Sequence, residues 1–161
     1  MKRTVVMTIL LAAVAAGTVY AGGSREAGGP VGNPDAARRV LIAAEYTRFK
    51  EALVEELVNQ LNDGNTYIKV IDHSKDELNG VDPREWSSVL ITNSGARAQV
   101  RPNVVGWLQS VAAYDDNVVL HTTQINDWTP QVQVDSVTSA SSMADLDRIA
   151  DSLLDRVRHH L

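Results

Sequence analysis

A short apolar run that ends in a small polar loop constrains the fold of this chain most strongly. Residues 89–91, Val-Leu-Ile, form an uninterrupted apolar segment, which predicts a strand buried on both faces. The polar residues 92–95 end this strand, and Pro102 opens a stretch with helical spacing of apolar residues. A strand, a polar turn and a helix in this order are typical of open α/β sheets. Their ligand sites lie at the carboxyl ends of the strands.

The same order of elements recurs along the chain. The further predicted elements are strands at 40–44, 67–71 and 117–122 and helices at 47–62, 102–112 and 142–161. Alternating strands and helices predict an open, mostly parallel sheet of four to five strands with helices on both faces. A fifth strand is expected at 131–134 as a short piece or an antiparallel strand. The connection before it is shorter than the crossover of about a dozen residues that parallel neighbours need.

The N-terminus has the pattern of a secretory signal peptide. Lys2 and Arg3 precede an uncharged, mostly apolar run at 4–16, and small residues at 19 and 21 fit a signal peptidase site after Ala21. This run is short for a membrane span, which needs about 20 residues, so cleavage is favoured over an uncleaved N-terminal anchor. We therefore expect residues 1–21 to be removed and the protein to be periplasmic or extracellular, without membrane insertion.

A second composition change separates this segment from the folded domain. Residues 22–38 are rich in Gly, Pro and Ala and have few large apolar side chains, which predicts a flexible linker. The remaining residues, 39–161, are numerous enough to bury one hydrophobic core. We therefore expect one α/β domain from 39 to the C-terminus.

Composition also excludes several kinds of site and partner. The sequence has no cysteine, which removes lipid attachment at cysteine, disulfides and thiolate chemistry. Loss of Lys2 and Arg3 with the signal peptide leaves 13 of the 15 basic residues against 20 acidic ones, a net charge of −7 that argues against nucleic acid as a partner. The four histidines show no ligand spacing, so no metal site is expected. No Gly-x-Ser-x-Gly motif marks a hydrolase, and the sequence leaves open whether the protein is an enzyme.

Three segments resemble the flavodoxin-like superfamily, across residues 39–161. They are the strand at 40–42 leading into a helix, 89–95 (VLITNSG) and 118–123 (VVLHTT). The resemblance implies a sheet of order 2-1-3-4-5, FMN over the loops after the first, third and fourth strands, and electron transfer to a redox partner protein. The implied cofactor-binding residues are Thr47, Asn93, Ser94, Gly95, Thr122, Thr123 and Trp128. Trp128 stands where the family often places an aromatic against the flavin ring, and simple packing of this side chain is the alternative.

The loop after the first strand departs from the family's pattern. In that family it carries a Ser/Thr-x-Thr-Gly-x-Thr run, which binds the FMN phosphate with hydroxyls and backbone amides. Here residues 44–50 read AEYTRFK, so the glycine is missing, Thr47 keeps the one hydroxyl of the motif, and Glu45 brings a negative charge. This degenerate loop favours an alternative function, a cofactor-free module that binds a small anionic ligand or a protein partner.

Five hydroxyl residues cluster within 135–142, just before the last predicted helix. They predict an anion site at the N-terminus of that helix, with capping by Ser142 as the alternative. Residues 135–141 also resemble the Asp-x-x-Ser/Thr-Gly-Ala-Ser/Thr motif of exported domains that carry FMN covalently, with Ser139 in place of the glycine. That resemblance implies attachment at Ser141. Thr138, Ser139 and Ser141 therefore join the candidate cofactor-binding residues.

Overall fold

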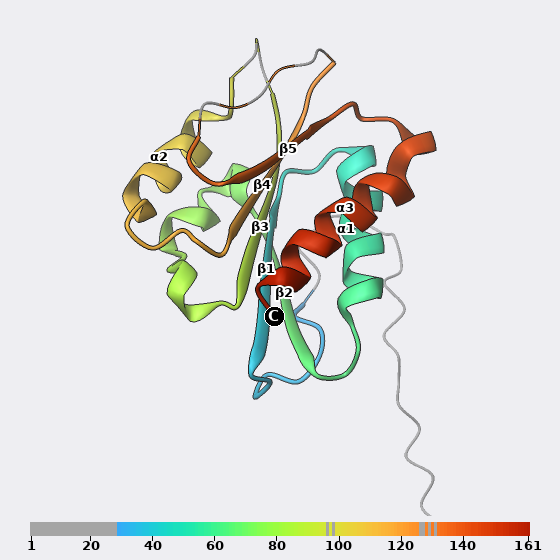
Figure 1. The fold of residues 1–161 in the computed structure, drawn as a ribbon, viewed down its shortest axis with the longest axis vertical. Helices are drawn as coiled ribbons and strands as arrows, with labels where there is room; N and C mark the ends of the chain where they lie inside the picture. Colours follow the sequence, from blue (N-terminus) through green and yellow to red (C-terminus); the bar gives the residue numbers. More distant parts are fainter. Residues whose placement is uncertain (1–28, 96, 98, 126–127, 129, 131) are drawn as a thin grey trace, which may run out of the picture.

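The structure is a computed structural model that describes residues 29–161, except 96, 98, 126–127, 129 and 131. The described residues form one sheet flanked by helices (Figure 1). The strands are β1 (Arg38–Ala44), β2 (Thr66–Asp72), β3 (Ser88–Ser94), β4 (Val118–Thr123) and β5 (Asp135–Ser139), and the helices are α1 (Arg48–Leu61), α2 (Pro102–Val111) and α3 (Leu146–His159). The strand order is β2-β1-β3-β4-β5 with all neighbours parallel, which confirms the predicted order 2-1-3-4-5.

Helices cover both faces of the sheet, as the sequence predicts (Figure 1). On one face α1 and α3 pack together over apolar side chains of β1, β2, β3 and β4. On the other face α2 and three short 3-10 turns, η1 (His73–Lys75), η2 (Glu77–Gly80) and η3 (Pro83–Glu85), enclose a second cluster. Strands β1 and β3 therefore lie between two apolar layers, which explains their continuous apolar sequences.

Helix α1 follows directly from its sequence pattern. The Thr47 side chain accepts a hydrogen bond from the backbone N–H of Lys50 and so caps the helix N-terminus. Phe49, Leu53 and Leu57 are buried at helical spacing, and the turn at Asn62 ends the helix. The predicted range 47–62 thus corresponds to the helix with its two caps.

The fifth strand differs from the prediction in position, and its direction, which the sequence left open, is parallel. It lies at Asp135–Ser139 rather than 131–134, and it pairs with β4 in the parallel direction. The apolar residues that suggested a strand, Val132 and Val134, are partly buried against the α2 side of the core and belong to the connection. The hydroxyl-rich segment forms the strand instead, because a half-exposed edge strand tolerates polar side chains.

The hydroxyl-rich segment does not form the N-terminus of the last helix, where the sequence places its anion site. Helix α3 begins at Leu146 with Asp145 at its N-cap, and a 3-10 turn, η4 (Met143–Asp145), precedes it. Ser142 makes no capping hydrogen bond with its side chain. A carboxylate therefore stands at the helix N-terminus, and the hydroxyls at 136, 138 and 139 belong to β5. The predicted apolar face of this helix is buried as expected, at Ile149, Leu153 and Val157.

The folded part begins before the predicted boundary at residue 39. Arg38 is the first residue of β1, and Val31 forms two backbone hydrogen bonds of 2.8 Å with Ile68 on the outer edge of β2. Gly32 has φ +89, and a Cβ there would collide with the Thr66 carbonyl, so this contact requires glycine.

The predicted signal peptide, 1–21, lies outside the described residues. Within the described part of the chain, no helix has the length and apolarity that a membrane crossing requires.

Candidate functional site

The carboxyl ends of the parallel strands gather polar side chains at one edge of the sheet. In the register of the sheet Asn93 lies beside Thr122, and Ser94 lies beside Thr123. Thr123 in turn lies beside Ser139 of β5. Because parallel strands all end at the same edge, residues far apart in the sequence meet here. The structure thus brings these predicted site residues together.

A buried lysine from α1 lies at the centre of this edge. The side chain of Lys50 is 1% exposed, and its ammonium donates to Ser94 Oγ at 2.7 Å and to Thr123 Oγ1 at 2.8 Å. It also forms an ion pair with Glu45 Oε1 at 3.2 Å. Burial lowers the pKa of Lys50 below its ordinary 10.5, although the charge of Glu45 opposes the shift. Two hydroxyl acceptors and one carboxylate ion pair thus surround the ammonium.

Glu45, which directly follows β1, lies between two cations. Its Oε2 accepts a hydrogen bond from the Arg101 guanidinium at 3.0 Å, while Oε1 faces Lys50. Burial alone would raise the pKa of Glu45, but a hydrogen bond from Ser94 and the charges of Lys50 and Arg101 outweigh it. The pKa therefore lies below its ordinary 4.5. The ionised cluster of Glu45, Lys50 and Arg101 carries one net positive charge.

Asn93 and Thr122 hold the framework of the site. Asn93 Nδ2 donates to Thr122 Oγ1 at 2.9 Å, and Asn93 Oδ1 accepts from the backbone N–H of Arg101 at 3.2 Å. The second bond ties the start of α2 to the end of β3. Both side chains are fully buried. Asn93 therefore positions the backbone of Arg101, and the polar groups of both side chains are not accessible to a ligand.

Two histidines lie beneath the site. His121 on β4 is fully buried, with Nδ1 2.9 Å from Thr92 Oγ1 and Nε2 2.8 Å from Ser139 Oγ. Burial, together with the nearby charge of Lys50, lowers the pKa of His121 from 6.5 to about 3. His73 is also buried, with Nε2 3.1 Å from the Thr92 carbonyl, and burial lowers its pKa too. Both rings are therefore neutral parts of the interior at neutral pH.

An open groove of about 740 Å³ runs over the carboxyl ends of β3, β4 and β5. Its lining residues are Ser94, Gly95, Arg97, Thr123, Gln124, Ile125, Ala140, Ser141 and Ser142. The backbone N–H of Gly95 donates to the Thr123 carbonyl at 2.9 Å, which fixes the near wall. Arg97 has φ +54, an uncommon conformation for a residue with a side chain. Ser94, Gly95, Thr123 and Ser141 are thus the predicted residues that line a groove.

The other predicted site residues do not line the groove, and their side chains take part in helix capping, core packing or the sheet. Thr47 caps α1, and its hydroxyl accepts the Lys50 amide. Trp128 is partly buried against the apolar cluster on the α2 side of the sheet, which agrees with the packing alternative. Ser139 is bound to His121, and Thr138 lies beside Thr122 in the sheet.

The loop after β1 does not fit the phosphate of FMN. A phosphate there would lie beside the buried Glu45 carboxylate. The Lys50 ammonium is already bound by Ser94, Thr123 and Glu45, and the Thr47 hydroxyl accepts a hydrogen bond from its own helix. Arg48 is exposed at the start of α1. The residues of this loop therefore bind each other where the family's motif would bind the phosphate.

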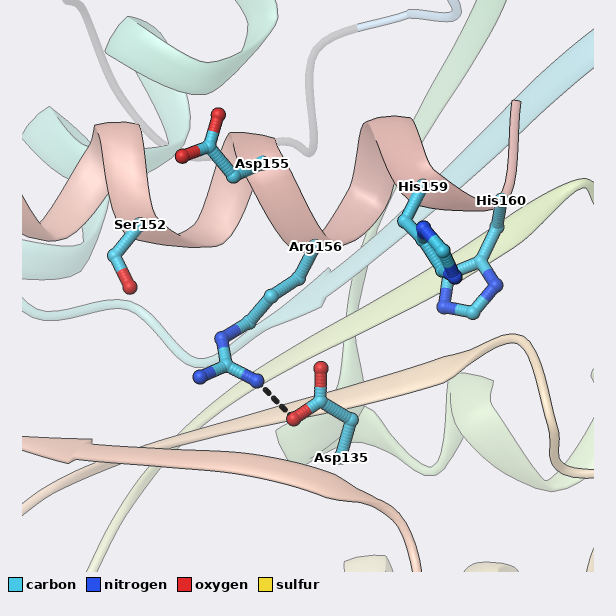
Figure 2. Close-up of a pocket in the computed structure, with 6 residues that line it drawn as sticks. All are labelled: Asp135, Ser152, Asp155, Arg156, His159 and His160. Atoms are coloured by element: carbon cyan, nitrogen blue, oxygen red, sulfur yellow. Dashed lines mark hydrogen bonds and ion pairs between the residues drawn. The ribbon is translucent and has the colours of Figure 1, made fainter.

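A second hollow lies at the opposite end of β5, against the C-terminal half of α3 (Figure 2). Arg156 pairs with Asp135 across it, and the rings of His159 and His160 meet edge to face with centroids 5.5 Å apart. None of the predicted site residues lines this hollow. In the described part of the chain, no three His, Asp or Glu side chains gather as a metal site.

Comparison with known proteins decides the fold class. No family model matches the sequence, and no curated protein matches it. A solved flavodoxin from the domain Archaea is similar in structure with a TM-score of 0.51 at 10% identity, over 76% of this chain and 98% of that chain. The fold is flavodoxin-like. The rubredoxin oxygen:oxidoreductase of Desulfovibrio gigas has a TM-score of 0.52 at 12% identity, over 76% of this chain and 36% of that chain.

The sequence reasoning missed the central role of Lys50 in this flavodoxin-like domain. Lys50 lies three, four and seven residues before Leu53, Val54 and Leu57, so it stands on the apolar face of α1. A lysine in such a stripe is buried only when it is paired, which is the signal that could have found it. Arg101 gave no such signal, because its partner Glu45 is distant in the sequence.

Proposed function

We propose that this flavodoxin-like domain is a cofactor-free module that binds a small anionic ligand in the groove over β3, β4 and β5. The buried Lys50 carries the proposal. Its ammonium lies directly beneath Ser94 and Thr123, the two hydroxyl residues that also line the groove. A fixed positive charge under a hydroxyl-lined surface favours phosphate or carboxylate groups.

The charges around the groove support an anionic ligand. The whole chain has a net charge of −5, yet the cluster of Glu45, Lys50 and Arg101 is positive by one charge. Arg97 is exposed in the groove wall and adds a guanidinium that can bind two oxygens of one anion. This local reversal of sign would attract an anion to the groove rather than to the remaining surface.

Thermal unfolding in the presence of phosphate, nucleotides and sugar phosphates tests the proposal. One of these anions should raise the melting temperature of the wild-type protein, and Arg97→Ala should abolish the increase. Lys69→Ala is the matched control, because Lys69 is an exposed cation on β2 and does not line the groove. The proposal fails if no anion raises the melting temperature, or if both variants lose the increase equally.

A second candidate function is FMN binding and electron transfer to a redox partner protein. Two observations favour it: the similarity in fold to a flavodoxin, and the position of Ser141, which is exposed and lines the groove. The phosphate would then lie outside the loop after β1. A visible spectrum and the intact mass of the protein from its native source separate bound flavin, covalent flavin and absence of flavin.

We also propose that the domain acts outside the cytoplasm, after removal of residues 1–21. The basic start, the apolar run and the small residues at 19 and 21 support this proposal. The intact mass of the protein from a periplasmic fraction tests it. A mature chain that begins at Gly22 is expected, and a chain that retains Lys2 and Arg3 contradicts cleavage.

A further inference from the structure

We propose that the Glu45 carboxylate is an internal anion that occupies a built anion site, and that this site accepts inorganic phosphate once the carboxylate is removed. The site lies at the start of α1, on the other side of Ser94 from the groove. This inference goes beyond the proposed function, because it concerns the position of the Glu45 carboxylate and not the groove.

The contacts of Glu45 are those of a bound ligand. Its two oxygens face two different cations, Lys50 at 3.2 Å and Arg101 at 3.0 Å. The cations come from separate helices, Lys50 from the first turn of α1 and Arg101 from the N-cap position of α2. Glu45 is 7% exposed. An anion held between an ammonium and a guanidinium, away from solvent, is the arrangement that proteins use for phosphate and carboxylate ligands.

The surroundings leave room for a replacement anion. A cavity of about 50 Å³ adjoins the cluster, lined by Ala44, Glu45, Tyr46, Lys50, Glu51, Val54 and Val70. Removal of the Glu45 side chain beyond Cβ would add the volume of a carboxylate and a methylene to this cavity. Lys50 would keep its bonds to Ser94 and Thr123, so the ammonium would stay in place. The exposed Glu51 would remain at the rim as the one acidic group of the lining.

Charge decides which anion the site holds. In the wild-type protein one carboxylate and two cations leave a single positive charge, and a second anion would meet Glu45 directly. Without Glu45 two positive charges remain, the half-exposed Arg101 and the buried Lys50, and a buried charge that has lost its ionic partner is costly. A phosphate ion that enters would restore the pairing. Removal of a negative charge at contact distance should therefore strengthen phosphate binding by about tenfold or more.

The experiment uses the full-length protein with Arg97→Ala as the background, which removes anion binding in the groove. Thermal unfolding is measured against inorganic phosphate at constant ionic strength, with chloride as the reference. In this background Glu45→Ala should gain a phosphate-dependent rise in melting temperature, about tenfold stronger in apparent affinity than the parent. Glu55→Ala removes the same charge from an exposed position on α1 and should gain nothing.

A second substitution identifies the cation. Glu45→Ala with Lys50→Met should lose the gain, because the ammonium is gone. The proposal is overturned if Glu45→Ala responds to phosphate no more than its parent, or if the response survives Lys50→Met. If Glu45→Ala is unfolded in chloride, refolding in phosphate supports the proposal, and failure of both Glu45→Ala and Glu45→Ser to refold there contradicts it. Failure of the groove proposal would leave these outcomes unchanged, since all variants lack Arg97.

Discussion

Lys50 on α1 and Thr123 at the end of β4 are 73 residues apart in the sequence, and the ammonium of Lys50 donates to the hydroxyl of Thr123 over 2.8 Å. This bond crosses from a helix on one face of the sheet to its carboxyl edge. It places a positive charge under the loops in which a flavodoxin-like sheet presents its ligands. The charge is neutralised in part by Glu45 from the chain segment between β1 and α1.

Lys50→Met should destabilise the protein strongly. The substitution leaves Glu45 with Arg101 as its remaining ion-pair partner, and loss of one member of a buried pair costs about 3 kcal/mol. Urea denaturation measures the loss. Glu45→Gln combined with Lys50→Met should recover at least part of it, because no buried charge then lacks its partner. Lys69→Met, at an exposed position, should change the free energy of unfolding little. A Lys50→Met protein as stable as the wild type would show that the pair contributes nothing.

Stability should fall as the pH is lowered from about 6.5, before the carboxylates titrate. In the folded protein His121 stays neutral down to about pH 3, whereas in the unfolded chain it binds a proton near its ordinary pKa of 6.5. Its contribution is therefore complete above pH 6.5 and is lost as the pH falls toward the folded pKa. One such group removes about 1.4 kcal/mol at about one pH unit below 6.5. The lowered pKa of His73 acts in the same direction.

Urea denaturation at about pH 7.5 and about pH 5.5 checks this pH dependence. His121→Gln keeps a polar side chain between Thr92 and Ser139 and removes the titrating ring. Its difference in stability between the two pH values should be smaller than that of the wild type by about 1.4 kcal/mol. Glu45 does not interfere, since its pKa lies below 4.5. An unchanged difference in the variant would assign the effect to other groups.

Gly95→Val should impair ligand binding in the groove more than folding. A Cβ at Gly95 would collide with Gln124 Oε1 and would lie 3.2 Å from Thr122 Cγ2. The Gln124 amide is the end of a flexible side chain, so the protein can fold with this group displaced into the groove. Ligand affinity, measured by thermal shift, should therefore drop. Gln124→Ala in addition to Gly95→Val should restore room beside residue 95. A variant that is unfolded by circular dichroism would mean that this glycine is required for the fold itself.

Gly106→Ala should stabilise the protein. Gly106 lies inside α2 at an exposed position, and a Cβ there would meet nothing within 4 Å. Alanine restricts the unfolded chain more than glycine does, so the free energy of unfolding should rise by about 0.5–1 kcal/mol. Urea denaturation gives the value, and Gly64→Ala is an informative contrast. Gly64 has φ +80, where alanine is strained, so that variant should lose stability although its surroundings are open.

The parallel sheet and the buried face of α1 could be predicted from local patterns, whereas the strand order 2-1-3-4-5 was implied by the resemblance to the flavodoxin-like superfamily. The runs in β1 and β3 are continuously apolar because both strands lie between two layers, and the stripe of α1 has helical spacing. The position of β5 could not be predicted in this way. Val132 and Val134 have the alternation of a strand, yet they pack beside α2, and a polar segment completes the sheet edge.

The sequence by itself determined the helices and every strand except β5, since hydrophobic periodicity and caps such as Thr47 act between near neighbours. It also determined that polar residues follow the third and fourth strands, and hence where a ligand edge lies. Only the tertiary structure decided which of these polar side chains bind each other and which remain accessible to a ligand. Pairing of Lys50 with Glu45, Ser94 and Thr123 depends on contacts between residues distant in the chain. A buried charge pairs with the polar groups that the fold brings close to it. Local sequence patterns do not predict which distant residues these are.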